Sequence, residues 1–387
     1  MGWSVDVDQA TFEKYRTVPA GPLRTLMDKS VLRSPEANGG DTPAPFARIQ
    51  MSPSLQCPFH NAEQLCQIQV EHGAEYLSHT CATFPRSVFD IDHFKVATLT
   101  LACPEAARLV LLTPNILSMN GEPAPFVTWD DAAKSFTSLR SNFWAVWELS
   151  IALIRNRNYP LWQRMFLLGT FSRRLQAVVR GESDRGFPAL LKDFAGAVVS
   201  GKLRASIETI PADLPLQLQM VMQLVNMQVQ GKRIHTRLQE CLNAFMEGIG
   251  NGRETTLDGQ CARYSAAYSN YYTPFFVKHP GILENLLMNS VFRRLFPFGA
   301  GLFDLEAKPE PAREFALLAT EFALLKGLLI GVAGCRKEAF SKEHVVHTVQ
   351  IVSKSFQHNS AFLINAHQLL VARNMDNARG LTMLLRN

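Results

Sequence analysis

Apolar residues recur with the period of an amphipathic helix along most of the chain. Phe143, Trp147, Ile151 and Ile154 fall at positions i, i+4, i+8 and i+11, which share one helical face. The same pattern predicts helices over residues 161–179, 188–199, 215–229, 234–245, 260–272, 282–296, 312–331, 344–355 and 361–373. No convincing alternating strands separate them. We therefore predict a mainly α fold, with a multi-helical C-terminal region over residues 126–387.

The helical pattern is weaker over residues 1–125, which we predict to form a separate N-terminal region. A small cysteine-rich module occupies about residues 50–112 of this region. Its segment 88–98 is typical of a short strand, because β-branched and aromatic residues are frequent there. A stretch with several prolines and a glycine, residues 113–125, ends the region.

Four short helices are predicted in the N-terminal region. Asp8 is a typical N-cap for the first of them, and the second starts at Leu23. The third covers residues 62–71, which would place Cys66 in its middle. The fourth begins at Pro104, a residue favoured in the first turn of a helix, with Cys103 at its cap.

Composition and charge narrow the possible partners and compartment. The 387 residues are 47% hydrophobic and 19% charged, as in globular proteins, and the net charge of +5 is spread along the chain. We therefore expect no nucleic-acid partner. The longest apolar stretch, residues 315–334, contains Glu321 and Lys326, so we predict a buried helix and no membrane span. The first residues lack the pattern of an export signal, which predicts a cytoplasmic protein.

The cysteines are unevenly distributed. Cys57, Cys66 and Cys81 fall within one short segment, and Cys103 follows them. Zinc takes about four thiolate or imidazole ligands, and an iron–sulfur cluster takes about four thiolates. These four cysteines are therefore the candidate metal ligands.

Other interpretations of the cysteines stay open. Cysteines in intracellular proteins are often small buried hydrophobic residues, and disulfides would require an oxidising compartment. His60 and His79 each lie within three residues of a clustered cysteine, so either one is an alternative fourth ligand.

The cysteine segment also resembles a known family. Cys57-Pro-Phe, Leu65-Cys-x-Ile and Thr80-Cys-x-x-Phe-Pro-Arg are similar to the cysteine module of the flagellin lysine-N-methylase (FliB) family, and to the small YkgJ-type proteins that bind zinc or an iron–sulfur cluster. Two further stretches, Leu99 to Arg108 and Glu284-Asn-Leu-Leu-Met-Asn289, resemble the methylase family alone. The start, Gly2-Trp3-x-Val-Asp, is also similar to the methylases.

The resemblance implies an enzyme that transfers a methyl group from S-adenosylmethionine to lysine side chains of flagellin. It also implies a cysteine-bound iron–sulfur cluster of the 4Fe-4S type, with zinc as the other candidate. Family members carry further cysteines just ahead of the Gly-Trp pair, whereas here Met1 directly precedes Gly2. Two alternatives are therefore kept: a non-catalytic protein that binds a metal or cluster, and an inactive, N-terminally truncated methylase relative.

Four of the seven tyrosines lie close together near the middle of the helical region. Tyr264, Tyr268 and Tyr271 share one face of a predicted helix, and Tyr272 adjoins them. Methyl transfer involves a sulfonium donor and an ammonium product, and aromatic faces attract such cations. These three tyrosines are the candidate donor-binding residues, with an aromatic packing seam as the alternative. The sequence identifies no catalytic base.

Overall fold

The computed structural model describes residues 5–34, 45–52, 56–91, 94–114, 116, 118–119, 122–123, 142–230, 234–250, 256–302, 309–357 and 359–387. The chain forms two compact units, Met1–Ser87 and Val88–Asn387. The division lies earlier than residue 125, because strand β5 (Phe94–Leu99) and helix α5 (Pro104–Leu112) pack against helices of the second unit. The start of the chain, Gly2-Trp3, lies outside the described residues.

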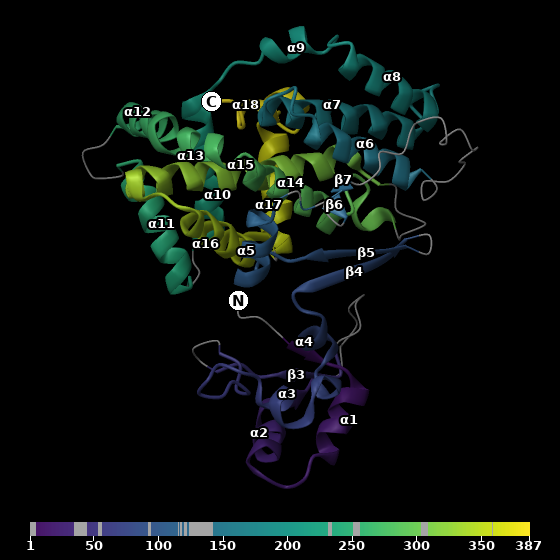
Figure 1. Ribbon diagram of the computed structural model, residues 1–387, viewed down its shortest axis with the longest axis vertical. Coiled ribbons are helices and arrows are strands. Elements are labelled where there is room, and N and C mark those ends of the chain that lie inside the picture. The colour runs from purple at the N-terminus through teal and green to yellow at the C-terminus, as the bar shows by residue number, and fades with distance from the viewer. Residues whose placement is uncertain are drawn as a thin grey trace. The chain divides into compact units, whose positions relative to one another are not determined.

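The first unit is a small antiparallel sheet covered by short helices (Figure 1). Its strand order is β1-β3-β2, and Val5 and Val31 both pair with Ile49. The elements are β1 (Val5–Val7), α1 (Gln9–Thr17), α2 (Pro22–Ser30), β2 (Val31–Arg33), β3 (Ala47–Ile49), α3 (Gln67–His72), η1 (Ala74–Tyr76) and α4 (His79–Thr83). The Asp8 carboxylate accepts a hydrogen bond from the backbone N–H of Thr11, at 2.8 Å, which confirms the predicted N-cap.

The second unit is almost entirely helical, as predicted. Strand β4 (Arg86–Ile91) pairs with β5, and β6 (Ser118–Met119) pairs with β7 (Glu122–Pro123). The helices after α5 are α6 (Phe143–Arg155), α7 (Leu161–Arg180), α8 (Phe187–Val199), α9 (Arg204–Glu208), α10 (Leu214–Val229), α11 (Thr236–Gly248), α12 (Leu257–Ala267), η3 (Tyr268–Tyr272), α13 (Thr273–Lys278), α14 (Gly281–Arg294), η4 (Gly299–Leu302), α15 (Pro311–Arg336), η5 (Lys337–Ala339), α16 (Lys342–Val352), η6 (Ser353–Gln357), α17 (Ser360–Ala372) and α18 (Ala378–Met383). The chain is therefore mainly α, with its strands in short pairs and one small sheet.

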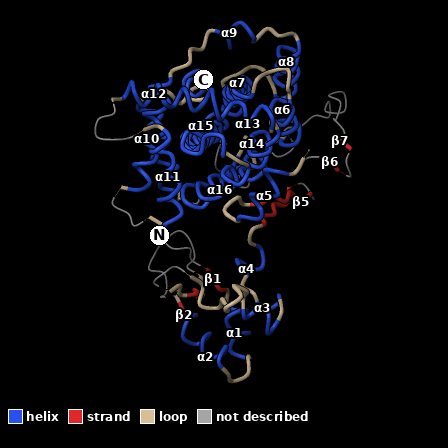
Figure 2. Tube along the Cα trace, turned by 60° about the vertical axis from the view of Figure 1, so that its left-hand side comes forward, coloured by secondary structure: helices blue, strands red, loops and turns tan. Residues whose placement is uncertain are grey.

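Helix α15 forms the centre of the second unit. It lies among the other helices in both Figure 1 and Figure 2, and its residues from Phe315 to Ala333 are all buried. By length and composition alone this helix could cross a membrane, but its apolar window is entirely buried within the fold. The predicted buried helix is therefore confirmed.

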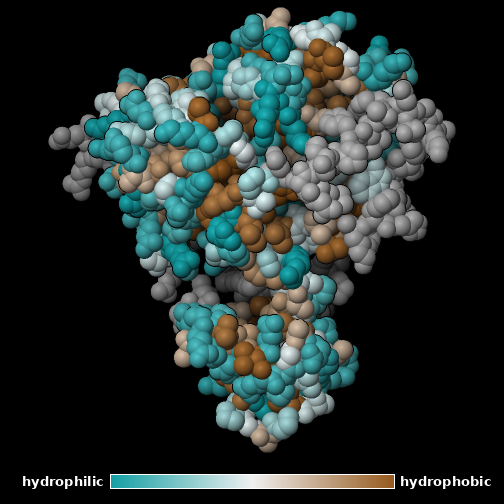
Figure 3. Space-filling model, viewed as in Figure 1, coloured by the Kyte–Doolittle hydropathy of each residue, from teal (hydrophilic) through white to brown (hydrophobic). Residues whose placement is uncertain are grey.

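Hydrophobic residues also appear on the outer surface. Figure 3 shows them among hydrophilic residues on the visible face of the second unit. Folded proteins normally expose much apolar area, so these residues alone indicate no binding site.

Helices α11 and α15 make the most extensive helix contact in the structure, and glycines allow it. A Cβ atom added at Gly248 would lie 1.7 Å from the carbonyl oxygen of Gly331. A Cβ atom added at Gly334 would lie 2.9 Å from the carbonyl oxygen of Gly248. Backbone atoms cannot rotate away as side chains do, so this crossing requires residues without side chains.

Replacing Gly248 by alanine should therefore lower the free energy of unfolding by about 1–3 kcal/mol or more, because the two helices must separate. Urea titration followed by circular dichroism at the helical signal measures the change. Gly196, within α8, is the matched control, because a Cβ atom there meets nothing within 4 Å. Gly196→Ala should leave stability unchanged or raise it by about 0.5–1 kcal/mol. Equal effects of the two substitutions would show that the crossing tolerates a methyl group.

Candidate functional site

Three of the four predicted metal ligands lie near one another in the first unit. Cys57, Cys66 and Cys81 all pack against its hydrophobic core. Burial raises the pKa of the Cys57 and Cys81 thiols, and the charge of the neighbouring Cys66 raises both further. Burial and then the charges of the same three cysteines raise the pKa of the Tyr15 phenol. The three thiols and this tyrosine therefore form one group, which we call the cysteine site.

Local turns position the cysteines. The Asn61 side chain accepts hydrogen bonds from the N–H groups of Glu63 (3.0 Å) and Leu65 (2.9 Å), and Gln64 has a left-handed backbone with φ 63°. This turn delays the helix, so Cys66 is the N-cap of α3 and not a mid-helix residue. The prediction that Cys66 lies mid-helix is wrong for this reason.

Cys81 lies in α4, whose N-cap is Ser78. The Ser78 hydroxyl accepts a hydrogen bond from the Cys81 N–H, at 3.4 Å. The backbone on either side of Cys66 is tied down as well, because the Gln67 N–H donates to the Phe59 carbonyl at 2.8 Å. These hydrogen bonds thus fix the backbone positions from which the Cys66 and Cys81 side chains extend.

The fourth predicted cysteine belongs to the other unit. Cys103 is the N-cap of α5 in the second unit, as the sequence predicts for its place on a helix. His60 and His79 are exposed. All seven cysteines are free thiols, so the disulfide alternative is not realised. Among the residues that the structure describes, no three His, Cys, Asp or Glu side chains are arranged to hold one metal ion. The three thiols of the cysteine site, as placed here, are therefore not arranged to hold one metal ion, and they do not fit a zinc site or an iron–sulfur cluster.

The candidate tyrosines lie where α12 changes its period. Residues Tyr268–Tyr272 form a π-helical turn, which holds one more residue than an α-helical turn. The turn rotates the chain, so that Tyr272 is buried with Tyr264 and Tyr271 is half-buried. The rings of Tyr268 and Tyr272 stack, with centroids 5.5 Å apart. Tyr264, Tyr268 and Tyr272 therefore pack together, and we call them the tyrosine face. Tyr271, the third residue that the sequence predicts for donor binding, is half-buried.

Lys326 of α15 meets this tyrosine face inside the core. Its Nζ atom lies 5.5 Å from the centroid of the Tyr268 ring and donates to the Leu385 carbonyl and the Asn387 side chain. Burial lowers the pKa of Lys326 from 10.5 to about 7. In the sequence this lysine only interrupts an apolar helix, and nothing in its neighbourhood along the chain indicates the contact with Tyr268.

Two stretches that resemble the methylase family pack against each other. The Asn289 amide of α14 donates to the Leu99 carbonyl at 3.1 Å, and its oxygen accepts from the Thr98 hydroxyl at 3.3 Å. The Asn285 amide donates to the carbonyls of Leu111 (3.3 Å) and Thr113 (2.9 Å). These side-chain bonds fix the end of α5 against the first turns of α14.

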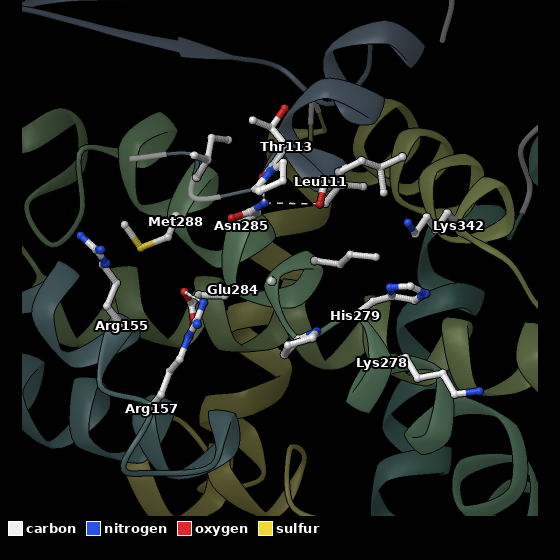
Figure 4. Close-up of a pocket in the computed structure, with 16 residues that line it drawn as sticks. Leu111, Thr113, Arg155, Arg157, Lys278, His279, Glu284, Asn285, Met288 and Lys342 are labelled. Carbon is white, nitrogen blue, oxygen red and sulfur yellow. Dashed lines mark hydrogen bonds and ion pairs between the residues drawn. The ribbon is translucent and has the colours of Figure 1, made fainter. Parts of the chain in front are cut away.

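A pocket of about 570 Å³ lies at this junction. Its volume is in the range of small-molecule sites. We call it the cationic pocket (Figure 4). Its lining comprises Leu111, Leu112, Thr113, Pro114, Ile116, Arg155, Arg157, Lys278, His279, Pro280, Gly281, Ile282, Glu284, Asn285, Met288 and Lys342.

Glu284 is the one carboxylate in the pocket lining, and it is already paired with two arginines. Its oxygens lie 3.0 Å from Nη2 of Arg157 and 2.9 Å from Nη1 of Arg164. Arg164 is buried and also donates to the carbonyls of Tyr159 (2.7 Å) and Ile154 (2.8 Å). This ion pair joins α6, α7 and α14 at one wall of the pocket.

The remaining charges of the pocket are positive. Within the described parts of the chain, Arg155, Lys278 and Lys342 form no ion pair with a carboxylate. Burial, and then the charges of Lys342 and Lys278, lower the pKa of His279. The pocket therefore has a positive field, which attracts anions and repels cations.

Sequence reasoning did not find this pocket. Its cations come from the end of α6, the following loop, the end of α13 and the start of α16, far apart in the chain. The one available signal was the methylase-like stretch Glu284 to Asn289, which supplies the pocket's carboxylate and amide.

The chain is similar to proteins of one family. The family model of the FliB lysine N-methylase C-terminal domain matches residues 148–384. Over 382 residues the chain is 22% identical to the Lysine-N-methylase of Salmonella typhimurium, which covers 95% of this chain and 88% of that protein. The Lysine-N-methylase of Salmonella choleraesuis matches at the same identity and coverage. The Flagellar biosynthetic protein FliU of Salmonella muenchen is 29% identical over 126 residues, 32% of this chain and 71% of that protein. No solved structure matches.

The methylase resemblance seen in the sequence is thereby confirmed at the level of the family. The family model covers most of the second unit, including all the charged residues of the cationic pocket and the tyrosine face. Because it matches more than half of the residues, the chain belongs to the FliB lysine N-methylase family.

Proposed function

We propose that this protein transfers a methyl group from S-adenosylmethionine to lysine side chains of flagellin. The observation that carries the proposal is the family match across residues 148–384, together with relatives named lysine-N-methylase that align with nearly the whole chain. The flagellar name of a third relative supports flagellin as the protein substrate. The unpaired thiols are typical of a reducing compartment, which supports a cytoplasmic location.

Methyl transfer requires a deprotonated lysine amine and a site that accommodates the positively charged sulfonium of the donor. A neutral lysine amine attacks the methyl carbon, a nitrogen–carbon bond forms as the sulfur–carbon bond breaks, and S-adenosylhomocysteine leaves. The amine must first lose a proton, because its ordinary pKa is about 10.4. Aromatic rings stabilise cations such as the sulfonium. Tyr268 and Tyr271 are the partly exposed tyrosines of this group and are our candidates for that contact, whereas Tyr264 and Tyr272 are buried in the core.

A second candidate function is metal or cluster binding at the cysteine site. The grouping of Cys57, Cys66 and Cys81 against one core supports it, as does their resemblance to YkgJ-type binders. An iron–sulfur cluster or zinc would need about four ligands, for which these thiols, Cys103 and a histidine are the candidates. Since no three of the described side chains are arranged to hold one metal ion, we assign the metal no step in the reaction.

Incubating the purified protein with S-adenosylmethionine and flagellin should produce methyllysine, detected by mass spectrometry of flagellin peptides. Omitting S-adenosylmethionine is the control and should abolish the product. The second candidate predicts a different outcome: flagellin stays unmethylated, while the protein purifies with iron or zinc that Cys57→Ser removes. Cys261→Ser, a cysteine of the second unit, should leave the metal content unchanged.

A further inference from the structure

We infer that the cationic pocket binds acidic side chains of the protein substrate, next to the lysine that is methylated. This inference rests on the proposed function, because it assumes a protein substrate. Four fixed cations line the pocket, namely Arg155, Arg157, Lys278 and Lys342. The one carboxylate, Glu284, is held by Arg157 and by the buried Arg164. The pocket thus has an excess of positive charge that a ligand must neutralise.

The pocket is a poor place for the reacting groups themselves. A lysine ammonium and a sulfonium are both cations, and like charges in one site cost free energy. The N-terminal end of α14 adds to this repulsion, because Gly281 and Ile282 of its first turn line the pocket and a helix N-terminus is partly positive. The pocket therefore suits a part of the substrate that carries negative charge.

The positions of the cations indicate an extended ligand. Figure 4 shows Arg155 and Arg157 on one side of the pocket and Lys278, His279 and Lys342 on the other, with Glu284 and Asn285 between them. A single phosphate needs donors that converge on one point within hydrogen-bond distance. Cations on opposite sides instead match carboxylates spaced along a peptide, since each side can neutralise a different one.

Apolar residues complete the fit to a peptide. Leu111, Leu112 and Ile116 come from the α5 side, and Ile282 and Met288 come from α14. These side chains can contact the methylene groups of glutamate and aspartate while the cations contact the carboxylates. Lys278 and Lys342 are exposed, so their ammonium groups are available to an incoming segment.

The test is a binding measurement that does not require methyl transfer. The probe is a fluorescein-labelled peptide with one lysine flanked on both sides by glutamates, and its match has glutamine at each glutamate. The acidic peptide should bind at least tenfold more tightly by fluorescence anisotropy, and its affinity should fall as salt is raised, because ions screen exposed charges. The double variant Lys278→Gln/Lys342→Gln should bind the acidic peptide about tenfold more weakly than the wild type.

Lys192→Gln/Lys202→Gln is the matched control, because it removes the same charge from exposed lysines outside the pocket and should bind like the wild type. Equal binding of both peptides, or an unchanged affinity in the pocket variant, would overturn the inference. A third result would also overturn the inference: the acidic peptide does not bind, whereas inorganic phosphate stabilises the wild-type protein against unfolding and does not stabilise the pocket variant. Selective peptide binding without any methylation would contradict the proposed function alone, whereas equal methylation of both peptides would contradict the inference alone.

Discussion

Replacing Glu284 by alanine should lower the free energy of unfolding by about 3–5 kcal/mol, because it leaves a buried arginine without its counter-ion. The side chains of Glu284 and Arg164 are only 12% and 10% exposed, so water cannot replace the lost carboxylate. The two carbonyls that Arg164 also contacts are neutral and cannot compensate its charge. Urea unfolding at neutral pH, followed by circular dichroism, measures the loss.

Two comparisons separate the ion pair from other effects. Glu284→Gln keeps the shape of the side chain and should cost less than Glu284→Ala. Glu182→Ala removes a carboxylate that is 61% exposed and 4.0 Å from Arg180, so it should change stability by less than about 0.5 kcal/mol. If Glu284→Ala were as mild as Glu182→Ala, the Arg164–Glu284 pair would not be what joins α7 to α14.

Most helices could be predicted because their signals are local. The apolar period of α7, α10 and α17 and the Asp8 cap all lie within a few residues of the element that they define. The predicted boundaries of α7 and α10 lie within one residue of those in the structure. In these segments the helix propensity and the pattern of buried positions both favour a helix, so the local sequence is sufficient to predict it.

The local errors have physical causes. The helical composition around Cys66 predicts a mid-helix position, but the Asn61 side chain forms a turn that competes with the helix. A regular α-helical period groups Tyr271 with Tyr264 and Tyr268, but the structure has a π-helical turn here, and Tyr272 is buried. A constant helical period cannot predict a turn formed by a competing side chain, nor a turn that holds an additional residue.

The cationic pocket could not be predicted because it depends on tertiary packing. Arg155, Lys278 and Lys342 line one pocket only after the fold has brought α6, α13 and α16 together. Along the sequence each of them resembles an ordinary surface cation. The cysteine site is the opposite case: its three thiols lie in one short segment, so the sequence singled them out and the structure groups them in one unit.

Replacing Lys326 by methionine should stabilise the protein near pH 7, and this advantage should shrink as the pH rises. The folded state lowers the pKa of Lys326 from 10.5 to about 7, because burial disfavours the ammonium. Between these two values the unfolded chain holds a proton that the folded protein does not, so the stability of the wild type rises with pH. Below about pH 7 both states are protonated, and the folded state carries the full cost of the buried charge.

The expected slope is about 1.4 kcal/mol for each pH unit, since one proton is released on folding in this window. Methionine has a similar length and no charge, so the variant lacks this slope, although it leaves the Leu385 carbonyl and the Asn387 side chain without their donor. Urea unfolding of both proteins from about pH 7 to 9 gives the difference, and the shared cysteines and tyrosines cancel from it. Lys192→Gln, which removes an exposed lysine, should run parallel to the wild type. If the difference in the free energy of unfolding between the wild type and Lys326→Met stays constant over this pH range, Lys326 remains protonated in the core, held by the Tyr268 ring and the two oxygens.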